Sequence, residues 1–293
     1  MKSLIDIVRI IHDDVYARMD DDSINVFLCG TKDQDGRSFR NRLQYLLKDN
    51  PKLNVIYPEW LFPSLMKQPD KDLLSLEQYL ADNVDVIVIP LEGPGAICEL
   101  GAFASSINLI PKIIVLNDMA YKRSRSFIAQ GPIRLIRNRN ADNVFYYSQD
   151  QQDKALKDVS TRLANLRRQR VPKDVTNLFN LYRFIALLLT VLQPITKKYL
   201  EEVLLALNLD INRDFIDPSI EILVEKGHVY VHGDSDRETI RLTDIGYVYY
   251  MDSSLARLHS RRHVASLRSI ALWRKSKDKP RINLEKERAR LLD

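Results

Sequence analysis

Short apolar segments alternate with amphipathic stretches along the first half of the chain. Runs of strand length occur at 25–29, 53–57, 84–90, 112–116 and 143–147, and stretches of helical spacing lie between them at 39–47, 73–81 and 96–106. The run at 84–90, VDVIVIP, is almost wholly apolar, which is typical of a central strand covered on both faces. The alternation therefore predicts an α/β fold with a doubly wound parallel sheet.

The second half of the chain has a different pattern. Residues 151–170 are polar with helical spacing, and Val171-Pro172 then interrupts the chain. Helices are expected at 177–192, 196–207 and 218–226, followed by a hairpin with a Gly-Asp-Ser-Asp tip and a further helix from Thr243. Helices followed by a hairpin and a further helix are the order of a winged helix, so a second, mainly helical domain of this type is predicted.

These patterns predict four regions. They are an α/β domain at 1–150, a helical linker at 151–175, a winged-helix-like domain at 176–260 and a basic tail at 261–293. Apolar residues at helical spacing also occur at 4–19, which predicts a surface helix or an interface element.

Positive charge is concentrated in the tail. Residues 261–293 contain 11 Lys or Arg and 4 Asp or Glu, whereas the rest of the chain has a balance of −2 and the whole chain of +5. Phosphate contacts are expected there, together with a base stacked on Trp273. The candidate contacts to nucleic acid or to a partner are Arg261, Arg262, Arg268, Trp273, Arg274 and Lys275. A solvated charged helix is the alternative.

Composition narrows the class of protein. No apolar run reaches the roughly 20 residues that a membrane span requires, and the N-terminus has no signal-peptide pattern, so a cytoplasmic protein without membrane contact is expected. The two cysteines, Cys29 and Cys98, are too few for a disulfide framework and too isolated for a zinc site. Each is either a packed thiol or a reactive one, and no metal site is predicted.

Glu99 is the main candidate for chemistry. It follows the strand at 84–90 and a loop in which Gly93 and Gly95 allow the backbone to approach a ligand. Ligands of parallel sheets bind outside the carboxyl ends of the strands, where Glu99 is expected at the start of a helix.

The loops after the first two strands supply further candidates. Gly30, Thr31 and Asp33 follow the first strand, where backbone amides can hold a phosphate or a ribose, although the full G-x-G-x-x-G pattern is absent. Tyr57 ends the second strand and either stacks on a base or packs in the core. Arg123, Arg125 and Arg134 can bind a pyrophosphate or a nucleic acid, or lie on solvated faces.

The segment from Gly95 to Gly101 has the form G-x-x-x-E-x-G and resembles the nucleophile segment of nucleoside 2-deoxyribosyltransferases. With the predicted winged helix, longer segments resemble the effector proteins of type II retrons. They are Phe27–Gly30, Tyr57–Glu59, Leu73–Glu77, Val84–Phe103, Ser126–Ile128 and Gly131–Arg134. Retrons are bacterial anti-phage systems that pair a reverse transcriptase and its multicopy single-stranded DNA with a toxic partner.

The resemblance implies a five-stranded flavodoxin-like sheet and a glutamate nucleophile at Glu99. It implies cleavage of an N-glycosidic bond, with NAD as the substrate and no cofactor. It also implies restraint by the reverse transcriptase and its RNA–DNA product, the multicopy single-stranded DNA, and an oligomeric assembly. Glu77 corresponds to an acid that addresses the base. The family has a further acid where this chain has Gly93, so Glu92, one residue earlier, is the candidate to reach the sugar.

Two other functions stay open at this point. One is a salvage enzyme, a nucleoside 2-deoxyribosyltransferase or nucleotide N-glycosidase, although salvage needs neither the winged helix nor the basic tail. The other is a non-catalytic, nucleotide-sensing regulator that binds DNA. The third predicted helix of the second domain, PSIEILVEK, has few side chains that read bases, which disfavours operator recognition.

Overall fold

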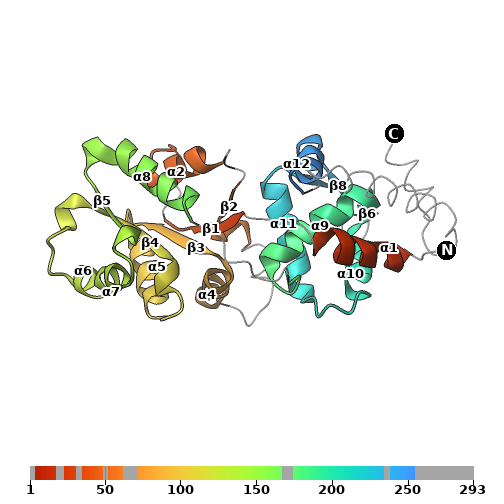
Figure 1. The fold of residues 1–293 in the computed structure, drawn as a ribbon, viewed down its shortest axis with the longest axis horizontal. Coiled ribbons are helices and arrows are strands. Elements are labelled where there is room, and N and C mark those ends of the chain that lie inside the picture. The colour runs from red at the N-terminus through yellow and green to blue at the C-terminus, as the bar shows by residue number, and fades with distance from the viewer. Residues whose placement is uncertain are drawn as a thin grey trace. The chain divides into compact units, whose positions relative to one another are not determined.

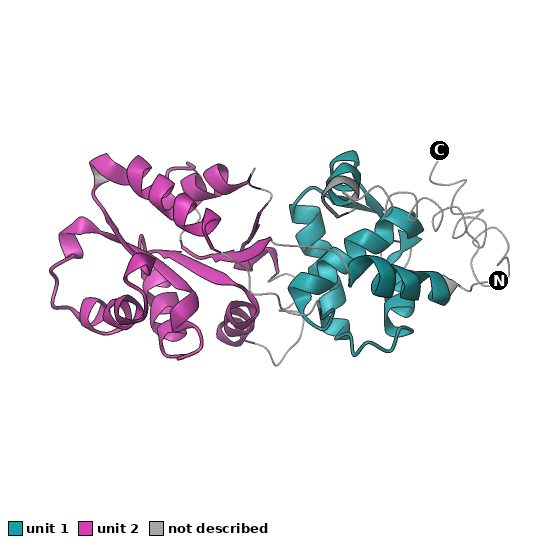
Figure 2. Cartoon of the chain, viewed as in Figure 1, with its two compact units in different colours: residues 1–21, 171–293 teal, residues 22–170 magenta. Residues whose placement is uncertain are grey.

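The chain divides into two compact units, one of residues 22–170 and one of residues 1–21 together with 171–293 (Figure 2). The computed structural model describes residues 4–17, 23–30, 35–48, 50, 52–61, 72–166, 174–233 and 238–254. The division differs from the predicted boundaries at 150 and 175. The N-terminal arm belongs with the second half of the chain, and the predicted linker helix belongs with the first.

The first unit is built on a five-stranded sheet with the order β2-β1-β3-β4-β5, and every neighbouring pair is parallel (Figure 1). The strands are β1 (Ile24–Leu28), β2 (Leu53–Ile56), β3 (Val86–Pro90), β4 (Ile113–Asp118) and β5 (Val144–Tyr147). This is the strand order of flavodoxin-like sheets, so the predicted doubly wound α/β fold is confirmed for this unit.

Helices cover both faces of this sheet (Figure 1). Helices α2 (Phe39–Leu47) and α8 (Gln152–Ala164) lie on one face, and α4 (Leu73–Asn83), α5 (Pro94–Ala104) and α7 (Pro132–Arg139) lie on the other. The short helix α6 (Phe127–Gln130) precedes α7. The sequence patterns did not predict α6 or α7.

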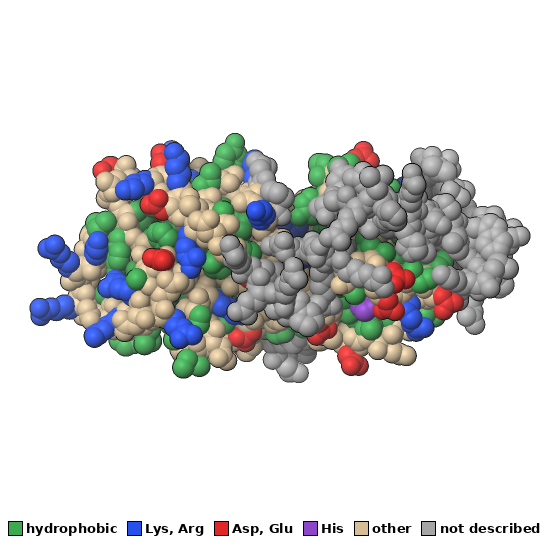
Figure 3. Space-filling view, in the orientation of Figure 1, with side chains coloured by type: hydrophobic (Ala, Val, Ile, Leu, Met, Phe, Trp, Pro, Cys, Tyr) green, Lys and Arg blue, Asp and Glu red, His purple; other side chains and the backbone are tan. Residues whose placement is uncertain are grey.

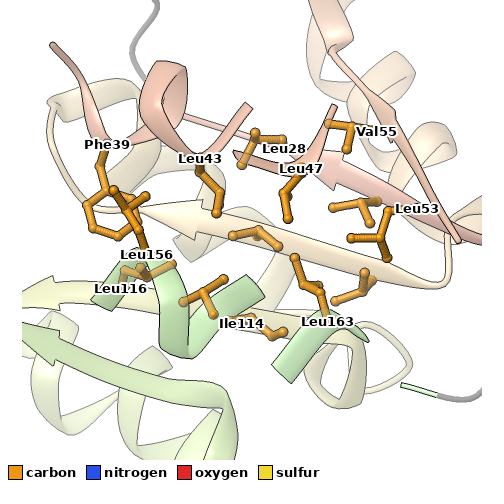
Figure 4. Packing of buried hydrophobic residues seen from close by; sticks show 14 of the residues in the cluster. Leu28, Phe39, Leu43, Leu47, Leu53, Val55, Ile114, Leu116, Leu156 and Leu163 are labelled. Carbon is orange, nitrogen blue, oxygen red and sulfur yellow. The ribbon is translucent and has the colours of Figure 1, made fainter. Parts of the chain in front are cut away.

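The core between the sheet and α2 and α8 explains why the predicted linker helix belongs to this unit (Figure 4). The buried side of α8 consists of Ala155, Leu156, Val159 and Leu163, which pack in one cluster with strand residues such as Leu28 and Ile114. The polar residues on the opposite side of α8 made this segment look like a solvent-exposed linker in the sequence. The helix is a covering layer of the sheet.

Local sequence signals set the starts of the helices around the sheet. The side chain of Ser38 accepts a hydrogen bond of 3.1 Å from the Asn41 amide and so caps α2. Pro94 occupies the first position of α5, where its missing N–H costs nothing. The helix therefore begins two residues earlier than the predicted start at residue 96.

The second unit contains the predicted helices and hairpin in the predicted order, together with a strand, β6, and N-terminal elements that were not predicted there. It contains α1 (Leu4–Ile10), a π-helical turn (Ile11–Tyr16), α9 (Leu178–Leu192), β6 (Ile195–Thr196), α10 (Lys197–Leu205), α11 (Ile216–Glu225), β7 (Val229–His232), β8 (Thr239–Leu242) and α12 (Asp244–Ser254). The strands form an antiparallel sheet with the order β6-β8-β7. Helix α11 starts two residues before the predicted Pro218. The winged-helix assignment stays a prediction.

Helix α9 is the centre of the second unit, because all fifteen of its residues are buried. The N-terminal arm packs on it. The Tyr16 hydroxyl donates a 2.9 Å hydrogen bond to the carbonyl oxygen of Asn180, and the Tyr16 and Phe184 ring centroids lie 5.2 Å apart. These contacts explain why residues 4–16 belong here and not to the predicted domain at 1–150.

Candidate active site

The ends of three neighbouring strands bring the candidate residues together. Strands β2, β1 and β3 are adjacent and parallel, so the residues that follow them lie at one edge of the sheet. From β1 the chain adds β2 on one side, and it then adds β3, β4 and β5 on the other side. Ligands in folds of this class bind at the point between β1 and β3 where the strand order reverses. Cys29 and Gly30 follow β1, Tyr57 and Glu59 follow β2, and Glu99 follows β3 on helix α5.

Glu99 lies in the second turn of α5, as the sixth residue of the helix. The sequence predicted Glu99 at the helix start. A helix dipole favours an anion at that position. Because the dipole acts within the first turn, that argument does not apply here. Other groups must therefore favour the ionised form of Glu99.

The residues after β1 supply hydrogen bonds to Glu99. The Cys29 thiol and the Gly30 amide both donate to its carboxylate. Burial raises the pKa of Glu99 above its ordinary value, whereas the Cys29 hydrogen bond, the Arg40 charge and the Gly30 amide all act to lower that pKa. One oxygen, Oε2, is buried and has no hydrogen-bond partner among the described residues.

Gly30 needs the conformational freedom of glycine. Its φ is +106°, a backbone conformation that residues with a side chain rarely adopt. The same residue contacts two site residues, because its amide donates to Glu99 and its carbonyl accepts a 2.8 Å hydrogen bond from Nη1 of Arg40.

Arg40 is a buried cation beneath the site, only 5% exposed. Its Nη2 donates to Glu59 in an ion pair, and its guanidinium carbon lies 4.8 Å from the centroid of the Tyr57 ring. Tyr57 is 3% exposed and also contacts Trp60 edge-on. Of the two roles that the sequence left open for Tyr57, this burial favours packing in the core, where the ring supports Arg40.

A third carboxyl group, Glu77 on α4, completes the cluster. Burial, together with the negative charges of Glu99 and Glu59, raises the pKa of Glu77 to about 7. Three carboxyl groups thus share one region with a single described arginine, Arg40. A cluster of this kind holds one carboxyl group protonated near neutral pH while another is ionised.

Glu92 follows β3 and lies beside the N-terminus of α2. Both of its carboxylate oxygens accept from the amide of Phe39, at 2.8 and 2.9 Å, at the N-terminus of α2. A contact between Glu92 and a sugar stays a prediction. Gly93 is the residue before α5, and Gly95, in the first turn, is exposed with open space around its α-carbon.

Several predicted residues fall outside the described part of the chain. They are Thr31, Asp33 and the tail residues Arg261, Arg262, Arg268, Trp273, Arg274 and Lys275. In the second unit, the third predicted helix is α11, and most of its residues are buried. No helix within the described ranges combines the length and apolar character of a membrane span, and no group of His, Cys, Asp and Glu side chains there is arranged to hold a metal ion.

Sequence patterns missed two members of the site and left a third ambiguous. Arg40 and Glu59 were not candidates, because a charged residue gives no sign in the sequence that it is buried beside another. Cys29 was left open between a packed and a reactive thiol. It is buried, and burial raises its pKa well above the ordinary value, as do the charges of Glu99 and Glu77, so it is a protonated donor.

Comparisons with known proteins agree on the family. A family model described as STM3845 retron effector protein matches residues 36–231. A relative from Escherichia coli, named as a ribosyltransferase/DNA-binding protein of retron Ec86, is 36% identical over 178 residues, which are 55% of this chain and 58% of the relative. A second, named in the same way for retron Ec73, is 34% identical over 117 residues, 38% of this chain and 37% of the relative.

The chain thus spans little more than half of the first relative's length and a smaller part of the second's. The family model covers about two thirds of the chain, including β2 to β5 and Glu99 in the first unit and α9, β6, α10 and α11 in the second. The chain therefore belongs to the STM3845 retron effector family.

Proposed function

We propose that this retron effector cleaves an N-glycosidic bond and that Glu99 is its nucleophile. The proposal rests on the hydrogen bonding of the Glu99 carboxylate. Cys29 and Gly30 hold it by hydrogen bonds, while Oε2 is buried and has no partner among the described residues. A buried carboxylate oxygen that accepts no hydrogen bond from a described donor is suited to attack an electrophilic carbon.

Cleavage of such a bond proceeds through an oxocarbenium-like sugar. As the bond from C1′ to the base nitrogen breaks, its electron pair leaves with the base and positive charge develops at C1′. The Glu99 carboxylate then forms an ester to C1′, and water hydrolyses that ester to regenerate the carboxylate. No cofactor is required by this sequence of steps.

NAD is the proposed substrate. Its nicotinamide is cationic before cleavage and leaves as a neutral molecule, so the leaving group needs no proton. The products are nicotinamide, ADP-ribose and a proton. The protonated state that burial favours at Glu77 would serve a neutral base, which must accept a proton as it leaves; this favours nucleosides or nucleotides as the second class of substrate.

The relatives' names support a glycosyl-transfer enzyme associated with nucleic acid. On that basis we place the chain in a retron, where the reverse transcriptase and its multicopy single-stranded DNA would restrain the toxic activity in an oligomeric assembly. The second unit, with its β6-β8-β7 sheet, would be the winged helix. Its largely buried α11 favours a docking role over base reading.

Glu99→Gln tests the proposal. Purified wild-type and variant protein are incubated with NAD, nucleosides and nucleotides, and the released bases are separated chromatographically. Wild type should release nicotinamide from NAD, and Glu99→Gln should lose at least about a thousandfold of that rate, as expected when a covalent nucleophile is removed. Asp158→Asn, which removes an exposed carboxylate from α8, is the matched control and should retain the rate.

The alternative functions give different outcomes. Transfer of deoxyribose between bases with no reaction on NAD would identify a salvage enzyme. Full activity of Glu99→Gln would exclude the proposed nucleophile. Absence of base release from every substrate, together with nucleotide binding, would favour the nucleotide-sensing regulator.

A further inference from the structure

The net positive charge of the first unit comes from one segment. Residues 22–170 contain 21 basic and 17 acidic residues, but residues 119–141, here called the basic segment, contain six basic residues and no acidic one. The rest of this unit is therefore slightly acidic. The six are Lys122, Arg123, Arg125, Arg134, Arg137 and Arg139.

The basic segment forms one edge of the unit. It begins directly after β4 ends at Asp118 and contains a turn of 3₁₀ helix (Met119–Tyr121) and helices α6 and α7. All six basic side chains are exposed. Figure 3 shows Lys and Arg side chains gathered at the end of this unit that carries α6 and α7.

Two parts of the segment meet at Tyr146 of β5. Lys122 Nζ and the Arg137 guanidinium carbon each lie 5.7 Å from the centroid of the Tyr146 ring. Arg137 Nη2 also donates a 2.7 Å hydrogen bond to the Tyr146 hydroxyl. The loop after β4 and the end of α7 therefore form one continuous surface.

Ion pairing explains none of these cations, and the helix dipole accounts for only two of the six. Within the described ranges, none of the six takes part in an ion pair with a carboxylate. Arg137 and Arg139 lie in the last turn of α7, where the helix dipole favours cations. Arg134 lies in the first turn, where the dipole disfavours a cation, and Lys122, Arg123 and Arg125 lie outside the α-helices.

Two aromatic side chains of the segment face solvent. Tyr121 is 60% exposed and Phe127 is 83% exposed. They lie on either side of Arg123 and Arg125 in the sequence. Exposed aromatic rings among unpaired cations match single-stranded nucleic acid, because the cations contact phosphates and unpaired bases stack on the rings. A duplex presents few free base faces for such stacking.

We propose that the basic segment is a binding surface for single-stranded nucleic acid on the α/β unit itself. These residues are distinct in the sequence from the basic tail at 261–293, and the proposal does not depend on the activity of Glu99. Its lysine and arginines bind the phosphate backbone, and Tyr121 and Phe127 accept stacked bases.

The test measures binding of a fluorescent oligothymidylate to the full chain by anisotropy over a salt series. The variant Arg123→Gln/Arg125→Gln/Arg134→Gln should bind about tenfold more weakly near physiological salt. The slope of log affinity against log salt should fall by about 2, because each lost phosphate contact on a single strand accounts for about 0.7. The control Lys52→Gln/Lys154→Gln/Lys157→Gln removes the same charge from exposed lysines elsewhere in this unit and should bind within about twofold of wild type.

The aromatic residues give an independent readout. Tyr121→Ala/Phe127→Ala should weaken oligothymidylate binding about tenfold but leave binding of inorganic polyphosphate, which has no bases, unchanged. Should thermal unfolding show that the triple variant is destabilised, Arg123→Gln/Arg125→Gln, which leaves α7 intact, replaces it. Oligonucleotide binding equal to that of the control variant would overturn the proposal and indicate another class of partner. Equal dependence of duplex binding on the two aromatic residues would overturn the single-strand assignment.

Discussion

The thiol of Cys29 donates a hydrogen bond to the carboxylate of Glu99. Cys29 directly follows β1, and Glu99 lies in the helix after β3, so the contact joins two adjacent strands at the point where ligands bind in this fold. The thiol stays protonated because burial raises its pKa, and the negative charges of Glu99 and Glu77 raise it further. Cys29 is thus a positioning donor for the proposed nucleophile.

Cys29→Ala should change the pH dependence of base release. The hydrogen bond from Cys29 lowers the pKa of Glu99, so without it that pKa rises and the carboxylate is protonated over a wider range. The acid limb of the rate profile should move to higher pH, by about one unit for a hydrogen bond to a charged group. The measurement is the rate of base release against pH.

Cys29→Ser is the control for this prediction. Serine retains a donor at the same position, so the acid limb should return toward that of wild type. An identical limb in wild type and Cys29→Ala would show that the hydrogen bond does not set the protonation of Glu99.

Glu77→Gln should change the pH dependence of stability. Burial raises the pKa of Glu77 in the folded protein to about 7, above its ordinary value of 4.5. The folded state therefore binds more protons than the unfolded state between these values, and the free energy of unfolding of wild type falls as pH rises through this window. Glutamine carries no charge, so Glu77→Gln should escape this loss and melt roughly 2–4 °C above wild type at pH 8.

Thermal unfolding of both proteins from pH 4 to 8 checks this prediction. The two melting temperatures should be closest at low pH and diverge toward neutral pH. A constant difference would mean that Glu77 ionises in the folded protein as it does in the unfolded chain.

Arg40→Met should destabilise the first unit strongly. The substitution leaves Glu59 without its ion-pair partner and leaves the Gly30 carbonyl without the Arg40 hydrogen bond. Breaking a largely buried pair by removing one partner costs several kcal/mol, which corresponds to a fall in melting temperature of roughly 6–10 °C. The double variant Arg40→Met/Glu59→Gln should recover part of this loss, because the uncompensated charge is removed. A double variant no more stable than Arg40→Met would argue against the pair.

Sequence patterns placed the sheet and Glu99 because both depend on local signals. The apolar run at 84–90 and the Gly-Pro-Gly loop after it indicate a central strand and its end, whatever the rest of the chain packs against it. The burial of Arg40 and the Cys29 hydrogen bond depend on which strands become neighbours, and a single sequence does not encode that locally. Helix α7 was missed because its buried face is short and three of its five other residues are arginines.

Gly30→Ala and Gly95→Ala should have opposite effects on stability. Gly30 has a φ of +106°, and an added Cβ would lie 3.4 Å from Pro90 Cδ, so alanine adds strain in a disfavoured conformation and should lower the melting temperature by a few degrees, roughly 2–6 °C. Gly95 lies in the first turn of α5, and its Cβ would meet nothing within 4 Å. Alanine there favours the helix and should raise the melting temperature by roughly 1–3 °C.

Enzyme kinetics distinguish the effect of Gly95 on helix stability from its effect on ligand binding. If the backbone at Gly95 approaches the ligand, as its place after β3 predicts, Gly95→Ala should raise KM for the substrate even though it stabilises the fold, because the added methyl group occupies space that the ligand needs. An unchanged KM with a raised melting temperature would mean that the ligand does not approach this turn of α5. Glu99 would then meet its substrate from the side of Cys29 and Gly30 alone.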